Sequence, residues 1–345
     1  MKMKQRLGLM GLILAIVIVL AGCGSNNGTN AANSTNSGTA SASASASQPA
    51  ESQQSEEASA SIETKQTTYP LTVKDASGEE ITFEKAPAQI VSTSPSETEI
   101  LFALGLGDRI VGVSDFDNYP AEAASKQKVG GVSEPNIEAI IGANADFVVS
   151  GISIKDTALE KLRSLGLNVF RTEPKKVEDV LSNILLFGQI NDKQAEAEAL
   201  VAKMREDIRK VTEAAATIKT EDKKKVYIEF SPGWTVGRGE FMDELISIAG
   251  GINIASDVEG WNAINEEKII KDNPDVIFYT LNITDESGKK LEDLIQGRSG
   301  WDKIKAIADK NLVGLDGDIL SRPGPRITEA LIQISNGIYP GLVKE

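Results

Sequence analysis

The sequence predicts an α/β fold in which two similar lobes are joined by one long helix, with a ligand cleft between the lobes. Short β-rich runs alternate with amphipathic segments through most of the chain, which is typical of mostly parallel sheets. Residues 192–220 contain no Gly or Pro and keep an apolar stripe, so they predict a joining helix of about 29 residues, roughly 43 Å long. A motif at Asn136 returns at Asn265, and this repeat indicates that the lobes are related.

The N-terminal lobe is expected over residues 69–175. Strands are predicted at "QIVSTS", "RIVGVS", "DFVVSG" and "LNVFRT", with helices at "ETEILFALG", "NIEAIIGA" and "DTALEKLRSLG". Residues 176–220 are a helical segment that includes the joining helix. "KVYIEF" opens a second series of strands and helices, which predicts a C-terminal lobe over residues 221–345. Ligands of such folds bind at the carboxyl ends of the strands.

Residues 1–22 have the pattern of a signal peptide. Three cations precede a run of 16 uncharged residues, Leu7 to Gly22, which is short for a membrane span of roughly 20 residues. The run ends in "LAGC", so that the only cysteine, Cys23, follows small residues. This resembles a bacterial lipobox, in which the chain is cut before the cysteine and the thiol receives a lipid. The alternative is an ordinary signal peptide with an incidental cysteine.

Residues 23–68 are expected to be the lipidated Cys23 followed by a flexible tether. The stretch consists almost entirely of Ser, Ala, Asn, Thr, Gly, Gln and Glu, and such a composition does not bury enough apolar surface to fold. As a coil of about 45 residues, its ends would lie roughly 35–40 Å apart. We expect it to hold the folded body away from a membrane.

The composition excludes several classes of function. The chain has no histidine, which removes Ser-His-Asp and Cys-His catalysis and histidine-ligated metal sites. Its formal net charge of −14 argues against nucleic-acid binding, and no phosphate-binding loop of the G-x-x-x-x-G-K-[ST] type is present. We therefore expect no enzyme, no resident cofactor and no metal. A carboxylate-dependent hydrolase is the alternative that the sequence leaves open.

Three aromatic residues follow or precede predicted strands and are candidate ligand contacts. Tyr119 lies in "DNYP", Trp234 in "SPGWT" and Trp261 in "EGWNAI". Aromatic side chains supply rigid stacking area and a polar tip. The alternative is that each one packs its own loop, and we expect that role for Trp301, which precedes an amphipathic helix.

The stretch "SRPGPRITEAL" is the most unusual local sequence. Its prolines stiffen a loop that presents Arg322 and Arg326, and a rigid loop can offer guanidinium groups to ligand oxygens with little loss of entropy. Arg322 is the stronger candidate for a ligand contact. For Arg326 an ion pair at the start of a helix is the alternative, and Arg238 is a further cation that could face the cleft.

Glu138 and Glu267 occupy equivalent positions in the two copies of the repeat. Each lies in the first turn of its predicted helix, where the helix dipole alone favours an acid. As a pair on one rim, they could instead dock a partner that carries matching arginines.

The segments "QIVSTSPSETEILFALGLGDRIVGVSDFDNYP", "KVGGVSEPNIEAI" and "LSRPGPRI" resemble the substrate-binding proteins of ABC importers, specifically the cobalamin and ferric-siderophore class. The resemblance covers about residues 71–342 and implies two α/β lobes bridged by one helix. It places the two permease-docking glutamates at Glu138 and Glu267. Because "NYP" and "SRPGPR" are most similar to vitamin B12 binders, it implies that Tyr119, Trp261 and Arg322 contact the ligand, with Trp234 beside them.

Ser94, which follows a predicted strand, and Val132 are further candidate ligand-binding residues. B12 binders often have an aromatic residue at the position of Val132, so this wall of the site is expected to be thinner. The implied function is capture of cobalamin or a related corrinoid, and its delivery to an ABC permease and ATPase complex. A ferric siderophore is the alternative ligand, and haem is disfavoured by the lack of histidine. The implied protein is a monomer, lipid-anchored on the extracellular face of a Gram-positive-type envelope; an adhesion lipoprotein is the alternative from another class.

Overall fold

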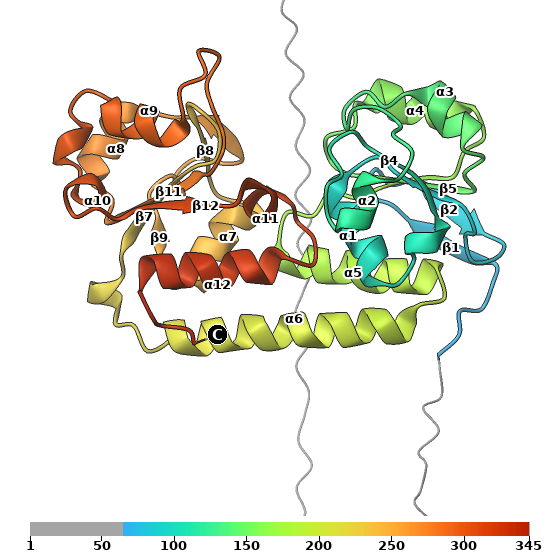
Figure 1. The fold of residues 1–345 in the computed structure, drawn as a ribbon. Helices are drawn as coiled ribbons and strands as arrows, with labels where there is room; N and C mark the ends of the chain where they lie inside the picture. The colour runs from blue at the N-terminus through green and yellow to red at the C-terminus, as the bar shows by residue number, and fades with distance from the viewer. Residues whose placement is uncertain (1–64, 345) are drawn as a thin grey trace, which may run out of the picture. The chain divides into compact units, whose positions relative to one another are not determined.

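The computed structural model describes residues 65–344 of the chain. The predicted signal peptide, Cys23 and nearly all of the predicted tether lie outside the described residues. Within them the chain forms two α/β lobes, each built on a four-stranded parallel sheet (Figure 1). The predicted fold class is confirmed.

The sheet of the N-terminal lobe has the strand order β4-β3-β5-β6, and all of its pairs are parallel. These strands are the four predicted ones: β3 (Ile90–Ser92), β4 (Ile110–Val113), β5 (Phe147–Ser150) and β6 (Val169–Arg171). An antiparallel hairpin, β1 (Leu71–Lys74) and β2 (Glu80–Phe83), precedes them. The strands are short and almost fully buried, which explains their continuous apolar sequence.

Helices connect the strands of this lobe, as expected for parallel pairs. They are α1 (Pro95–Ala103), α2 (Ala121–Ala124), α3 (Ile137–Gly142) and α4 (Asp156–Ser164). Pro95 opens α1 at its first position, where a missing N–H costs no hydrogen bond.

The sheet of the C-terminal lobe has the order β12-β11-β7-β9 and is also parallel. Its strands are β7 (Lys225–Glu229), β9 (Ile252–Asn253), β11 (Val276–Thr280) and β12 (Leu312–Leu315). A separate antiparallel ribbon joins β8 (Trp234–Val236) to β10 (Trp261–Ala263). The helices are α7 (Phe241–Ile248), α8 (Glu266–Asp272), α9 (Leu291–Gly297), α10 (Lys305–Ala308), α11 (Gly317–Ser321) and α12 (Ile327–Ile338).

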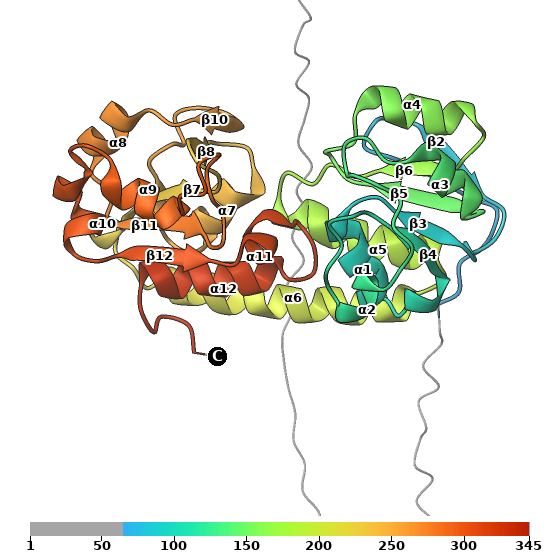
Figure 2. The ribbon, with the colours of Figure 1, turned by 45° about the horizontal axis from the view of Figure 1, so that its top comes forward.

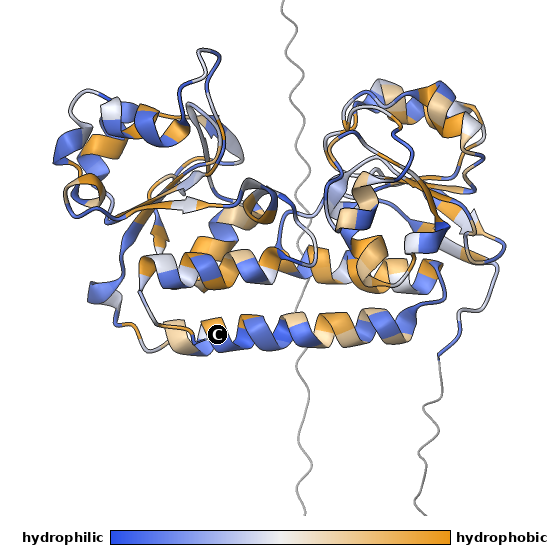
Figure 3. Cartoon of the chain, in the orientation of Figure 1, coloured by the Kyte–Doolittle hydropathy of each residue, from blue (hydrophilic) through white to orange (hydrophobic). Residues whose placement is uncertain are grey.

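Two helices, α5 (Val177–Ile190) and α6 (Gln194–Ala215), connect the lobes, and α6 packs against both α5 and α12 (Figures 1 and 2). Polar residues cover much of α6, whereas the sheet strands are mostly apolar (Figure 3). The close approach of α5 to α6 needs Gly188, because a Cβ there would lie 2.4 Å from the Cβ of Ala197.

The predicted joining helix exists, but its predicted limits, 192–220, are wrong. The observed α6 has 22 residues, about 33 Å. Asp192 has a positive φ of 57° in the turn after α5. At the other end the chain turns at Thr217 and Ile218, and Ile218 packs beside Gly250, which directs the chain into β7.

The internal repeat is visible in the backbone. Asn136 and Asn265 cap α3 and α8, each accepting a hydrogen bond from a backbone N–H three residues later. Asn144 and Asn273 end the same helices with positive φ values of 51° and 50°. The start and the end of each helix are therefore set by the same residue types in both lobes.

The repeat also includes an aspartate after each helix, which bonds to the neighbouring strand of the sheet. Asp146 accepts hydrogen bonds from the backbone N–H groups of Ala88 and Gln89, at the start of β3. Asp275 accepts one from the backbone N–H of Lys225, at the start of β7. Both aspartates thus bond to the chain where an inner strand of their sheet begins.

Candidate functional site

The carboxyl ends of the N-lobe strands form one wall of a cavity of about 260 Å³, which we call the N-lobe cavity. Loops after β3, β4 and β5 contribute its lining, and the segment 321–323 closes it. Loops at the carboxyl ends of parallel strands meet at one edge of a sheet, which explains why residues far apart in sequence surround one space.

A second cavity of about 400 Å³, the C-lobe cavity, lies at the carboxyl ends of β7, β11 and β12. Phe230, residues 280–283 and residues 316–318 line it. Ser321 lines both cavities, so they adjoin one another at α11. Together they are the candidate ligand site.

Three of the predicted ligand residues, Ser94, Val132 and Arg322, line the N-lobe cavity. Trp261 lies near the C-lobe cavity. Its ring meets that of Phe230 edge to face, with centroids 4.9 Å apart, and it stays 39 % exposed.

Trp234 and Tyr119 lie elsewhere. Trp234 pairs with Ala263 across the β8–β10 ribbon and is exposed. Tyr119 lines a different cavity of about 440 Å³, together with Phe102 of α1 and Leu200 of α6. The structure therefore does not bring Tyr119 to the lining of the N-lobe or C-lobe cavity.

Sequence reasoning missed three exposed apolar side chains of the site. Phe116 and Ile152 line the N-lobe cavity and are 59 % and 41 % exposed, and Leu281 lines the C-lobe cavity and is 40 % exposed. Phe116 follows β4 in "SDFDNYP", so its position after a strand was the available signal. Exposed apolar side chains on both walls suit a large ligand with apolar surface.

Arg326 forms the ion pair that was the alternative expectation for it. Its guanidinium donates to both carboxylate oxygens of Glu99, and its Cζ lies 4.1 Å from the centroid of the Tyr119 ring. Glu99 is almost completely buried in α1, so a C-lobe arginine supplies the charge that an N-lobe carboxylate needs.

The guanidinium group of Arg322 also forms its hydrogen bonds within the protein. Nη1 donates to Glu99 at 3.0 Å and to the Asn118 side chain at 2.8 Å, whereas Nη2 donates to the Phe116 carbonyl at 3.2 Å and pairs with Asp318 at 2.7 Å. Arg322 therefore lines the N-lobe cavity and at the same time holds the backbone that carries Phe116.

Ser94 and Glu97 line the N-lobe cavity, and buried hydroxyl groups lie close to them in the structure. The Thr93 hydroxyl hydrogen-bonds Ser150 at 2.8 Å, and the Thr172 hydroxyl donates to Glu97. Burial raises the pKa of Glu97, and the hydroxyls of Ser94 and Thr172 offset this only in part. Ser94 is half-buried, whereas Glu97 is 1 % exposed.

Arg238, which was expected as a possible cleft-facing cation, and Trp301, which was expected to pack, both have structural roles. Arg238 pairs with Glu259 at 2.8 Å on the exposed surface. Trp301 is fully buried and packs edge to face on Tyr227, with centroids 6.0 Å apart, so its predicted packing role is confirmed.

Glu138 and Glu267 are both exposed, at the second position of α3 and α8. The asparagine caps give both helices the same start, so the carboxylates occupy equivalent places in the two lobes. This arrangement agrees with the predicted docking pair without testing it.

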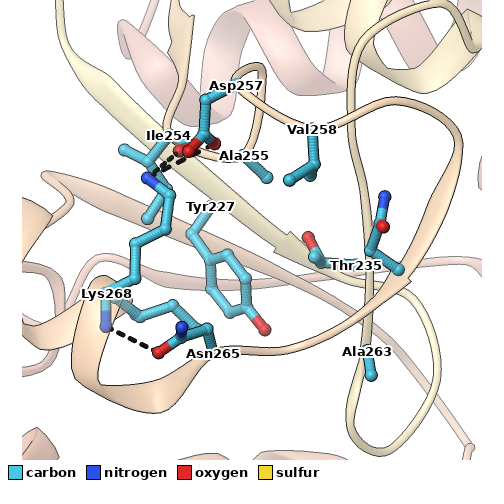
Figure 4. Close-up of a pocket in the computed structure, with 11 residues that line it drawn as sticks. Tyr227, Thr235, Ile254, Ala255, Asp257, Val258, Ala263, Asn265 and Lys268 are labelled. Carbon is cyan, nitrogen blue, oxygen red and sulfur yellow. Dashed lines mark hydrogen bonds and ion pairs between the residues drawn. The ribbon is translucent and has the colours of Figure 1, made fainter.

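A further cavity of about 220 Å³ lies inside the C-terminal lobe, between the β8–β10 ribbon and α8 (Figure 4). Its polar side chains already have partners within the protein. The Tyr227 hydroxyl donates to Glu229, Thr235 donates to a backbone carbonyl, and Lys268 contacts Asp257 and the Ile254 carbonyl. These three side chains are therefore engaged within the protein.

Among residues 65–344, no helix combines the length and the apolar character that a membrane crossing needs. In the same part of the chain, no three His, Cys, Asp or Glu side chains gather as metal ligands would.

A profile of the periplasmic binding protein family matches residues 90–319. The ABC transporter substrate-binding lipoprotein YvrC of Bacillus subtilis is 32 % identical, and the alignment covers 99 % of this chain and 100 % of YvrC. A cobalamin-binding protein of Halobacterium salinarum is 29 % identical over 79 % of this chain and 75 % of its own length.

Solved structures agree with the fold. A protein of Staphylococcus epidermidis, described as a possible iron-binding (periplasmic solute-binding) protein, is 31 % identical, with a TM-score of 0.64 over 74 % of this chain and 100 % of its own. The vitamin B12 binding protein BtuF of Vibrio cholerae is 24 % identical, with a TM-score of 0.63 over 73 % of this chain and 96 % of its own, and this likeness concerns the fold alone.

Proposed function

This chain belongs to the periplasmic binding protein family, and from that premise we propose that it captures cobalamin or a related corrinoid and delivers it to an ABC importer. Its place among the substrate-binding lipoproteins of ABC transporters implies a small ligand and a permease and ATPase complex as partners, and makes it a binding protein and not an enzyme.

The choice of ligand rests on the exposed apolar side chains that lie on both sides of the site. Phe116 and Ile152 offer exposed apolar surface on the N-lobe side, and Trp261 with Phe230 does so on the C-lobe side. A corrinoid is large, partly planar and close to neutral, so it suits aromatic and aliphatic walls.

The charges near the site support the same choice. A ferric catecholate is strongly anionic and needs unpaired cations. Arg322 and Arg326 are instead bound to Glu99, and Arg238 to Glu259. A relative named as a cobalamin-binding protein, aligned over 79 % of this chain, adds support from sequence.

We also propose that Cys23 carries the lipid and that Glu138 and Glu267 dock the permease. The alignment with a named lipoprotein extends over 99 % of this chain and supports the anchor. The equivalent positions of the two acids on α3 and α8 support the docking pair.

Isothermal titration tests the choice of ligand. The soluble body, residues 65–345, is titrated with cyanocobalamin, cobinamide, haemin and a panel of ferric siderophores. We expect tight binding of a corrinoid without turnover. Heat with a siderophore or haemin, and none with either corrinoid, would reject the corrinoid and favour the alternative ligand.

A further inference from the structure

The internal repeat has the same residue at six equivalent positions, and contacts within the fold account for four of them. In each copy one asparagine caps the helix, a second ends it, and the aspartate bonds to the start of a strand. The first isoleucine of each copy, Ile140 or Ile269, is buried in its lobe. The two positions that remain are those of Glu138 with Glu267 and of Ile141 with Ile270.

Ile141 and Ile270 are exposed on short helices, to 47 % and 39 %. Isoleucine is a poorer helix former than lysine, glutamine or glutamate, so an exposed helical position gains nothing from it in the free protein. The residues that follow have diverged, because Gly142 in α3 corresponds to Lys271 in α8. One exposed isoleucine would be ordinary. The same exposed isoleucine in both diverged copies indicates a role outside the fold.

Each isoleucine lies three residues after the repeated acid. Residues at this spacing share one face of a helix, with Cβ atoms about 5–6 Å apart, so each lobe presents an acid and an isoleucine side by side. We call these two pairs, Glu138 with Ile141 and Glu267 with Ile270, the acid–isoleucine patches. The helices that carry them belong to different lobes, and both lie away from α6 (Figure 1). Neither isoleucine lines any of the cavities described above.

The acids of both patches are available to a partner. No lysine or arginine of residues 65–344 bonds Glu138 or Glu267, whereas the neighbouring Glu266 pairs with Arg298 at 3.5 Å. An unpaired acid beside exposed apolar surface is complementary to a cation beside an apolar pocket. Two equivalent patches on one chain fit a partner that presents this combination twice.

We infer that Ile141 and Ile270 bind the permease, each as the apolar half of a contact whose other half is the acid one turn earlier. Burial of the isoleucine against an apolar pocket supplies affinity, and the acid sets the register by meeting an arginine or lysine beside that pocket. The inference rests on the proposed docking of the permease by Glu138 and Glu267, and it names the side chains that add apolar contact there.

Ile141→Ser combined with Ile270→Ser tests the apolar half of both contacts. Serine has about the helix propensity of isoleucine, so the double variant should fold as wild type does, and urea unfolding checks this. In cells that carry the full-length variant, we expect uptake of labelled cyanocobalamin to fall about tenfold, which is the effect of losing one interface anchor or more. Titration of the soluble body with cyanocobalamin should give the wild-type affinity. A weakened affinity there would overturn the inference.

Two controls accompany the serine pair. Ile141→Leu combined with Ile270→Leu keeps the apolar surface, so uptake should stay within about threefold of wild type. Ile252→Ser removes an isoleucine that is 45 % exposed on β9 of the C-terminal lobe, outside both patches, and should leave uptake unchanged.

Photo-crosslinking tests the contact without relying on the ligand. The photoreactive amino acid p-benzoylphenylalanine replaces Ile141, Ile270 or, as the control, Ile252 in the full-length protein in its own cells. We expect the first two positions to crosslink to one membrane protein, which mass spectrometry identifies as an ABC permease, and the control position not to. Absence of the permease from the crosslinks at both patches would overturn the inference.

The outcomes separate the inference from the proposed function. If the serine pair takes up cyanocobalamin at the wild-type rate, the inference is wrong, and Glu138→Ala with Glu267→Ala then decides the proposed docking by itself. If wild type takes up no cyanocobalamin, the proposed ligand is wrong, and the crosslinks alone decide the inference.

Discussion

Arg326 donates Nε to Glu99 Oε2 at 2.8 Å and Nη2 to Glu99 Oε1 at 2.6 Å, which joins the start of α12 in the C-terminal lobe to α1 in the N-terminal lobe. Arg326→Met leaves the buried Glu99 carboxylate with Arg322 alone. We expect the free energy of unfolding to fall by about 3 kcal/mol, the loss typical of a broken buried pair. Urea denaturation measures it.

Arg209→Met on the exposed face of α6 is the control for this pair. Arg209 bonds Glu206 and Glu213 at the surface, where water and salt screen the pairs, so we expect its loss to change the unfolding free energy far less than Arg326→Met does. Equal losses for the two variants would show that the Glu99 pair does not stabilise the lobes.

Phe116→Ala and Trp261→Ala test the apolar walls. Each removes exposed aromatic area from one side of the site, and we expect the affinity for cyanocobalamin to fall about tenfold or more. Titration of the soluble body measures it. Leu165→Ala, which removes an equally exposed apolar side chain at the end of α4, should leave the affinity unchanged. An unchanged affinity in both aromatic variants would reject these walls as ligand contacts.

Glu138→Ala combined with Glu267→Ala tests docking. We expect the affinity for the ligand to stay at the wild-type level while cellular uptake falls, because both acids are exposed on helices outside the two cavities. Uptake of labelled ligand and titration of the purified variant measure the two properties separately. Glu160→Ala on α4 is the control. Loss of ligand binding in the double variant would contradict a docking role.

Asp75 predicts a pH dependence of stability. Burial acts to raise its pKa, but hydrogen bonds from Ser77 and the Arg171 backbone, with the Arg163 cation, outweigh it and hold the pKa below the ordinary value. A carboxyl whose pKa is lower in the folded state stabilises the fold above its unfolded pKa, and this contribution is lost as the pH falls through the folded value.

Asp75→Asn should therefore lower the unfolding free energy at pH 7 by about 2 kcal/mol. The difference from wild type should shrink as the pH falls below about 4. Urea unfolding between pH 7 and pH 3 measures this. Asp156→Asn, an exposed carboxylate paired with Arg171, should show little effect at any pH. A difference that stays constant down to pH 3 would contradict the assignment.

Cys23→Ala tests the anchor. We expect the protein to appear in the medium or to be mislocalised, because two acyl chains hold a protein at a bilayer far better than none. Cell fractionation measures this, with Ser25→Ala as the control. Retention of the Cys23→Ala protein in the membrane would show that the cysteine is incidental.

The strands and the repeat could be predicted because their signals are local. Buried strands have continuous apolar sequences, and asparagine is a residue typical of helix starts, so Asn136 and Asn265 mark where α3 and α8 begin. The end of α6 could not be predicted, because it depends on the packing of Ile218 beside Gly250, far away in the sequence.

The site could be predicted only in part for the same reason. Phe116 and Tyr119 lie in one loop after β4, and their spacing does not tell which of them faces the N-lobe cavity. Arg322, 206 residues further along the chain, bonds the Phe116 carbonyl and so holds Phe116 at the cavity. Arg326 instead lies over the Tyr119 ring. The Glu99–Arg326 pair, separated by 227 residues, is equally invisible in a single sequence.

Asn136 and Asp146 in one lobe, and Asn265 and Asp275 in the other, hold equivalent helices in the same way. This matters for how a permease could sense a bound ligand. Each lobe fixes the orientation of its own acidic helix through local hydrogen bonds, so a bound ligand has no need to reshape either helix. If Glu138 and Glu267 dock the permease as proposed, a change at the ligand site reaches the permease only by altering the distance between these two acids. A permease bound to both acids at once would respond to the distance between them. That distance would then distinguish the ligand-bound protein from the ligand-free one.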